Sequence, residues 1–228
     1  MIKKILITII LIILVAIGIF LYATRPAAAP SQSVDSATIP NSSAVSSTAT
    51  TSRIYRISQS ESLVEFRIGE ILNSNPKTVI GTTTEVAGVI TISRNSVMFG
   101  PLAVNARTFK TDSEKRDGAI ARFILKSEED GNEFMTFTPK MVTGVPATIA
   151  TTTTLNLIVS GDLTIAGMTK PATFAVVMKV ADDALTGTAT LKLKRADFGL
   201  KIPEVKSVAG VDEEFTVTAT IKATRVSN

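Results

Sequence analysis

Apolar and polar residues alternate at every second position over long ranges of this chain from Arg53 onward. In Pro171–Val180, Ala172 and every second residue after it are apolar, and the residues between them include Thr173 and Lys179. The ranges Leu185–Lys194 and Phe215–Thr224 repeat the pattern. Successive side chains of a strand point to opposite faces, so each range offers one face to a core and one to water. The alternation therefore predicts an all-β domain of antiparallel strands.

Weaker alternation and turn residues predict the other elements. Gly161-Asp162 and Ala181-Asp182-Asp183 are expected turns. Asp112-Ser113-Glu114 offers an N-cap and an acidic first turn, and the apolar residues through Ile124 then share one helical face, which predicts one short helix. Short strands with a single helix are typical of a barrel or a sandwich. The further expected strands are Ser62–Ile68, Val79–Thr84, Gly88–Ser93, Leu102–Ala106, Glu133–Val142, Thr154–Ser160 and Leu163–Ile165.

The composition excludes several classes of function. The chain has no Cys and no His, so it has no thiolate or imidazole for a metal, no cysteine nucleophile and no Ser-His-Asp triad. The carboxylate runs, such as Glu128-Glu129-Asp130, lack the spacing of a calcium loop, and no phosphate-binding glycine motif is present. We therefore expect no catalysis, no metal and no cofactor. The net charge of +4 divides evenly between residues 1–52 and 53–228, which is too weak for a nucleic-acid partner.

The first 25 residues are expected to be a transmembrane signal-anchor. Ile5–Ala23 contains nineteen residues without a charge, and a helix of that length spans about 28 Å, close to a bilayer core. Lys3 and Lys4 precede it, so the positive-inside rule places the N-terminus in the cytoplasm. The expected location is thus the cell membrane, single-pass, with the C-terminal domain extracytoplasmic, either periplasmic or at the cell surface. A cleaved signal peptide, cut after Ala29, is the competing interpretation and would give a secreted protein.

Residues 26–52 are rich in Ser, Thr, Ala and Pro and carry a single charge, Asp35. Such a segment buries too little apolar surface to offset the entropy cost of ordering it. It is predicted to be a disordered linker that joins the anchor to a folded domain over residues 53–228.

Two motifs of that domain resemble those of YceI-like domains. The first is Gly161-Asp162-Leu163-Thr164-Ile165-Ala166-Gly167-Met168-Thr169-Lys170-Pro171, and the second is Arg195-Ala196-Asp197-Phe198-Gly199-Leu200. The resemblance covers about residues 53–225, and Tyr55 stands where the family commonly has Trp. It implies an eight-stranded, antiparallel, lipocalin-like barrel that binds a polyisoprenoid or similar long-chain amphiphile. The implied partner is an isoprenoid or fatty-chain lipid, held without catalysis.

The inward faces of the strands allow two interpretations. Their apolar side chains can fill the interior completely, which would make the protein a structural or interaction domain of the cell envelope. Small residues on the same faces, such as Gly187 and Ala189, instead leave room for a ligand, and with the resemblance added we favour the ligand. Arg116 and Asp117 are candidates for its polar end, although clamping the short helix is the alternative role. The candidate lumen residues are Phe66, Ile90, Val104, Phe123, Phe137, Leu157, Phe174, Val176, Leu191, Phe215 and Val217.

Overall fold

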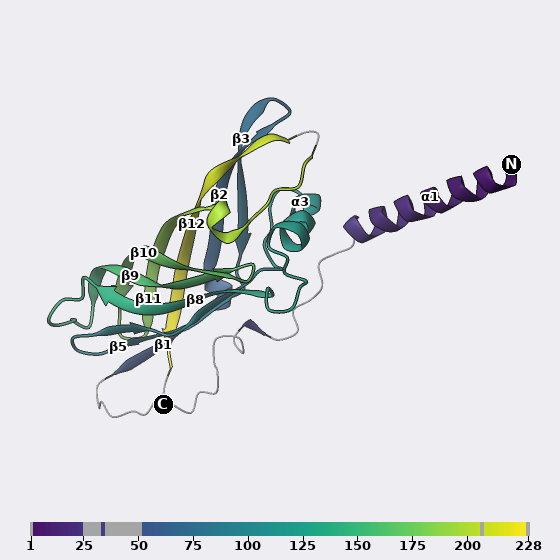
Figure 1. Ribbon diagram of the computed structural model, residues 1–228. Coiled ribbons are helices and arrows are strands. Elements are labelled where there is room, and N and C mark those ends of the chain that lie inside the picture. The colour runs from purple at the N-terminus through teal and green to yellow at the C-terminus, as the bar shows by residue number, and fades with distance from the viewer. Residues whose placement is uncertain (1, 25–32, 35–51, 206–207, 227–228) are drawn as a thin grey trace.

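The computed structural model describes residues 2–24, 33–34, 52–205 and 208–226. Helix α1 (Ile2–Thr24) lies outside the folded domain and points away from it (Figure 1). Within the described ranges, no helix meets the length and apolarity that a membrane crossing requires. Most of the predicted linker over residues 26–52 lies outside the described residues.

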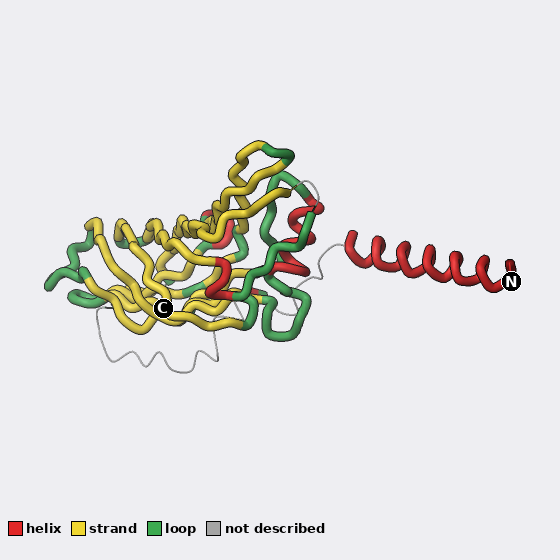
Figure 2. Tube along the Cα trace, turned by 45° about the horizontal axis from the view of Figure 1, so that its top comes forward, coloured by secondary structure: helices red, strands yellow, loops and turns green. Residues whose placement is uncertain are grey.

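The domain is mostly β, and its strands form one antiparallel sheet that is strongly curled (Figure 1 and Figure 2). Its strands are β1 Arg53–Ile57, β2 Leu63–Leu72, β3 Asn75–Thr83, β4 Val86–Ala87, β5 Val89–Ile92, β6 Val97–Phe99, β7 Leu102–Asn105, β8 Phe134–Thr143, β9 Thr153–Ile165, β10 Met168–Val180, β11 Ala184–Lys194 and β12 Val208–Arg225. The predicted all-β architecture of antiparallel strands is confirmed.

Neighbouring strands pair in the order β4-β7-β8-β9-β10-β11-β12-β1-β5-β6. Strand β12 also pairs with β2, and β2 pairs with β3. The eighteen-residue β12 is long enough to hold both β2 and β1 along one edge while β11 occupies the other. This double pairing of one strand joins the first and last strands of the domain.

The predicted turn at Gly161-Asp162 is wrong, because both residues lie inside the continuous strand β9. A Cβ at position 161 would stand 2.3 Å from the Thr138 carbonyl oxygen, so the glycine is needed where β8 approaches closely at an irregularity near Pro139. The actual turn is Ala166-Gly167, which joins β9 to β10 with φ angles of 49° and 75°. Positive φ at both central residues is typical of a tight two-residue hairpin turn.

The predicted helix is present, but it changes from an α-helix to a π-helix partway along. Ser113 accepts a hydrogen bond from the Arg116 backbone N–H and begins α3 (Glu114–Ala119). The chain continues as a π-helical turn, η2 (Ile120–Ile124). Two short 3-10 turns, η1 (Gln59–Glu61) and η3 (Arg195–Phe198), were not predicted, because segments of three or four residues are too short to show a period.

The core at the end of the sheet near β1 and β5 is filled by side chains. Tyr55 and Ile92 are fully buried there, and the Tyr55 hydroxyl donates a 2.7 Å hydrogen bond to the Ala181 carbonyl oxygen. Burial raises the pKa of this phenol. The hydroxyl thus stays protonated and satisfies a carbonyl at the filled end of the domain.

We expect Tyr55→Phe to lower the free energy of unfolding by about 1 kcal/mol, because it removes that hydrogen bond and leaves the carbonyl without its partner. Urea unfolding measures the change. Ser160→Ala, which removes a hydroxyl pair with Thr173 on the exposed face, is the control and should change stability by less than about 0.5 kcal/mol. Equal stabilities of the Tyr55→Phe variant and the parent would contradict the assignment.

Candidate functional site

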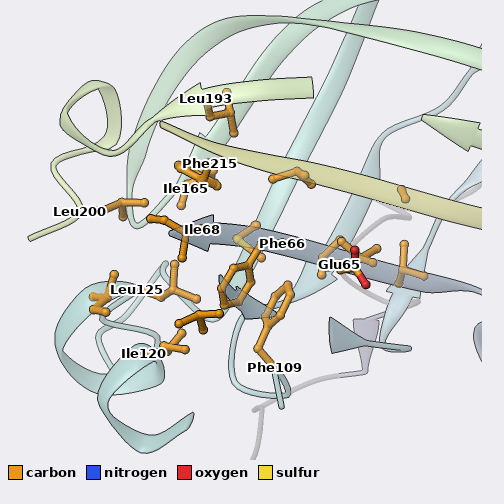
Figure 3. Close-up of a pocket in the computed structure, with 18 of the residues that line it drawn as sticks. Glu65, Phe66, Ile68, Phe109, Ile120, Leu125, Ile165, Leu193, Leu200 and Phe215 are labelled. Atoms are coloured by element: carbon orange, nitrogen blue, oxygen red, sulfur yellow. The ribbon is translucent and has the colours of Figure 1, made fainter. Parts of the chain in front are cut away.

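The curled sheet encloses a cavity of about 800 Å³ whose wall is predominantly apolar (Figure 3). Its size lies in the range typical of ligand-binding pockets. The wall is built from the inward faces of the strands, and the π-helical turn η2 closes part of one side with Ile120, Phe123 and Ile124. The cavity is therefore the interior of the domain itself.

Small side chains make this space, as their position in the register shows. Val176 on β10 lies opposite Ala189 on β11, which in turn lies opposite Ala219 on β12. The next row pairs Met178 with Gly187. Bulky residues in these rows would meet across the interior, whereas alanine and glycine leave it open.

Phe66 shows how the wall accommodates an aromatic ring. Its cross-strand partner is Gly81, where a Cβ would stand only 2.1 Å from the ring. The ring therefore lies over the glycine and packs against Phe109 at 5.5 Å between centroids. Elsewhere on the cavity wall, Phe137 and Phe174 make an edge contact with 4.9 Å between ring centroids.

The structure brings together most of the residues that the sequence analysis selected for the lumen. Those that line the cavity are Phe66, Ile90, Val104, Phe123, Phe137, Phe174, Val176, Phe215 and Val217. Leu157 does not line it and belongs to the packed core, where its side chain is 1% exposed. Leu191 is partly buried and also packs against that core.

Several lining residues were not selected from the sequence. Phe99 comes from a strand too short to show alternation, and Phe109 and Leu200 come from segments without regular structure. Others lie on strands whose alternation could have identified them, among them Leu102, Met178 and Leu185.

Charged residues gather where the cavity opens, between the β2–β3 hairpin and α3. Arg116 donates to a carboxylate oxygen of the buried Glu70 at 2.9 Å and also pairs with Asp112. Lys77 on β3 donates to the other oxygen of Asp112 at 2.6 Å. The Lys77 ammonium, helped by Arg116, holds the pKa of the Asp112 carboxyl below its usual value. These pairs connect the hairpin to α3 across the opening.

Asp117 is buried and does not line the cavity. One oxygen of its carboxylate accepts hydrogen bonds from both the backbone N–H and the hydroxyl of Thr111, each at 2.7 Å. Lys110 lies 3.7 Å from the other oxygen. These contacts tie α3 to the segment before it, whereas Arg116 remains at the opening.

The second YceI-like motif of the sequence, Arg195–Leu200, packs against β12 at one end of the sheet. Arg195 donates to the carbonyl oxygens of Leu200, Val211 and Asp212, which secures η3 against β12. Gly199 ends η3 in the left-handed conformation with φ 61°. Among the described residues, no group of carboxylates is placed to hold a metal ion.

Comparisons with known proteins agree with this geometry. The sequence model of the YceI-like domain matches residues 55–223. A polyisoprenoid binding domain from Saccharophagus degradans superposes with a TM-score of 0.60 at 14% identity, over 75% of this chain and 98% of that one. BcnA from Burkholderia cenocepacia gives 0.58 at 17%, over 74% and 99%. The YceI protein of Campylobacter jejuni gives 0.50 at 15%, over 65% and 85%. A search of curated proteins gives no match.

We expect Asp117→Ala to lower the free energy of unfolding by about 2 kcal/mol, because it strips a buried N–H of its charged acceptor. Thermal or urea unfolding measures the loss. Asp130→Ala, in an exposed turn, is the control and should stay within about 0.5 kcal/mol of the parent. Parent-like stability of Asp117→Ala would show that the carboxylate is not structural.

The Asp112 carboxyl should titrate below its ordinary pKa, and Lys77→Met should move its midpoint upward. The pKa of Asp112 is lower in the folded protein than in the unfolded chain. The Lys77–Asp112 pair therefore stabilises the fold at pH values above the ordinary pKa of Asp112, and this stabilisation is lost as the pH falls through the pKa in the folded protein. Carboxyl NMR chemical shifts followed against pH give both midpoints. An unchanged midpoint in Lys77→Met would contradict the role given to the lysine.

Proposed function

The chain belongs to the YceI-like domain family, and we propose that its domain holds one long-chain amphiphile, a polyisoprenoid or a similar lipid, in the apolar cavity without acting on it chemically. The observation that carries the proposal is the 800 Å³ cavity. Protein interiors pack to the density of organic crystals and leave few voids larger than a water molecule. A cavity of this size with an apolar wall is suited to an apolar ligand.

The pairing pattern supports a lipocalin-like barrel of eight strands. Strands β3, β4 and β5 follow one another within residues 75–92, as do β6 and β7 within 97–105. If each series counts as one bent strand, and β1 with β2 as another, the sheet contains eight strands. The pairing of β12 with β1 and β2 then links the last of them to the first, and the β4–β7 and β5–β6 pairings link the second to the third. A barrel of eight strands has room for one small ligand.

Removal of hydrocarbon from water would drive binding. Each buried methylene contributes about 0.8 kcal/mol, so a chain of a dozen contributes roughly 10 kcal/mol before the costs of ordering. The polyisoprenoid-binding relative from Saccharophagus degradans is consistent with a chain of this kind. The polar end of the lipid would lie at the opening beside Arg116, the charged residue of the predicted pair that lines the cavity.

We propose further that the N-terminal segment anchors the protein as a single-pass membrane protein, with the domain outside the cytoplasm. The nineteen uncharged residues of Ile5–Ala23 and the preceding Lys3 and Lys4 support this placement. The protein would then be a membrane-bound lipid carrier or a lipid store.

A structural or interaction domain without a ligand is the second candidate. That function requires side chains to fill the whole interior, as they do around Tyr55. The open space over the row of Val176, Ala189 and Ala219 favours the lipid instead.

Val176→Trp should lower the amount of lipid that co-purifies with the full chain, because the indole would occupy the space that the lipid needs. Native mass spectrometry and lipid extraction measure the occupancy. Val177→Trp is the matched control: it makes the same change on the adjacent, outward-facing residue, which is 52% exposed, and should retain the parent's lipid content.

A second variant tests the same prediction in case Val176→Trp does not fold. Ala189→Leu also narrows the cavity, from the strand paired with β10, by a smaller change. Loss of lipid from Val176→Trp and Ala189→Leu, together with retention of lipid by Val177→Trp, would support the lipid-carrier function. Lipid-free parent protein after incubation with isoprenoid lipids would reject the carrier and favour the interaction domain.

A further inference from the structure

We propose that the opening of the cavity lies against the surface of the lipid bilayer that holds α1, so that a lipid can pass between bilayer and cavity without crossing water. This inference rests on the membrane anchor of the proposed function. It adds an orientation of the domain and a partner surface, the phospholipid bilayer itself.

The position of α1 supports this orientation. The C-terminal end of α1 faces the domain (Figure 1), and α1 comes within 8 Å of α3 between Cα atoms. Helix α3 borders the opening through Lys115 and Arg116. In both whole-molecule views, the short helices at the opening lie on the side of the sheet nearest α1 (Figure 1 and Figure 2). A bilayer that contained α1 would therefore meet this side of the domain first.

Val34 limits how far the domain can move from the bilayer. Its side chain is 2% exposed and packs in a small cluster with Ala87, Ala103 and Phe134. Ala87 and Ala103 are register partners that alternate with cavity-lining neighbours, so this cluster lies on the outer face of the sheet.

Docking of Val34 shortens the effective tether. Residues 25–33 connect it to α1, and a fully extended chain of this length reaches only about 35 Å. A tether attached first at Arg53 would reach about 100 Å by the same measure. The docked residue thus confines the domain to the neighbourhood of the membrane.

The rim of the opening carries apolar side chains suited to a bilayer surface. Phe123 and Val205 both line the cavity and are 42% and 51% exposed, so they lie where it opens. Ile71, at the end of the β2–β3 hairpin, is 38% exposed next to the lining residue Leu72. Exposed apolar groups around one opening mark an interaction surface, and such groups insert at the boundary of headgroups and acyl chains.

Single tryptophans test the orientation, because the chain has none of its own. The full chain is reconstituted in phosphatidylcholine vesicles with and without acyl-chain bromine, which quenches tryptophan on contact. Ile71→Trp places the probe on the rim but outside the cavity wall, so that a bound lipid does not quench it. Met98→Trp places it on β6, whose partner β5 lies at the end of the domain away from α3 (Figure 1). Phe20→Trp reports on α1.

We expect the brominated vesicles to quench most of the emission of Phe20→Trp and Ile71→Trp and to leave Met98→Trp unchanged. Quenching in Phe20→Trp without quenching in Ile71→Trp would overturn the orientation and leave the anchor standing. No quenching in Phe20→Trp would overturn the anchor and the orientation together. Equal quenching of Ile71→Trp and Met98→Trp would also overturn the orientation. Lipid occupancy, measured separately by native mass spectrometry, reports on the carrier alone.

Val34→Asp tests the tether in the Ile71→Trp background. A buried carboxylate should release the segment and reduce the quenching at position 71, while quenching at position 20 in the matching Phe20→Trp background stays the same. Ser33→Asp adds the same charge at the exposed neighbouring residue and should leave both signals unchanged. Full quenching at position 71 in Val34→Asp would overturn the role of Val34.

Discussion

The interior of this domain depends on the pairing of β12 with strands on both of its edges. One edge holds β11 over eleven register pairs, and the other holds β2 and then β1. Because β1 and β2 begin the domain and β12 ends it, this pairing bends the sheet and turns one face of every strand inward. The apolar residues on those faces leave water together, and that burial is the main force that stabilises the curled sheet.

The same inward faces serve packing at one end and a cavity at the other. Around Tyr55 and Ile92, large side chains fill the interior. Farther along, Ala189 and Ala219 lie in the row of Val176, and the sheet keeps its curvature because its backbone hydrogen bonds do not depend on side-chain size. The domain can therefore keep its fold while leaving space for a ligand. The residues that stabilise the fold and the residues that leave the space are different ones.

The opening combines charge pairs with apolar groups. Glu70, Arg116, Asp112 and Lys77 connect the hairpin to α3, and Phe123 stands exposed beside them. Such an opening suits a long-chain lipid, whose polar end needs charge or water and whose chain needs the wall. In the proposed orientation, docking of Val34 on the outer face would keep this opening near the bilayer.

Much of the fold follows from the period of two in β9 to β12, because alternation specifies which face of a strand is buried whatever its partners are. The long motif from Gly161 to Pro171 likewise identified the family. The sequence could not exclude a turn at Gly161, since only the approach of β8 shows why Gly161 must lack a side chain. Nor could it separate Leu157 from Phe174, which share an inward-facing pattern. Which inward residue meets the cavity and which meets another side chain depends on what lies across the interior, and that is decided by the register and curvature of the sheet.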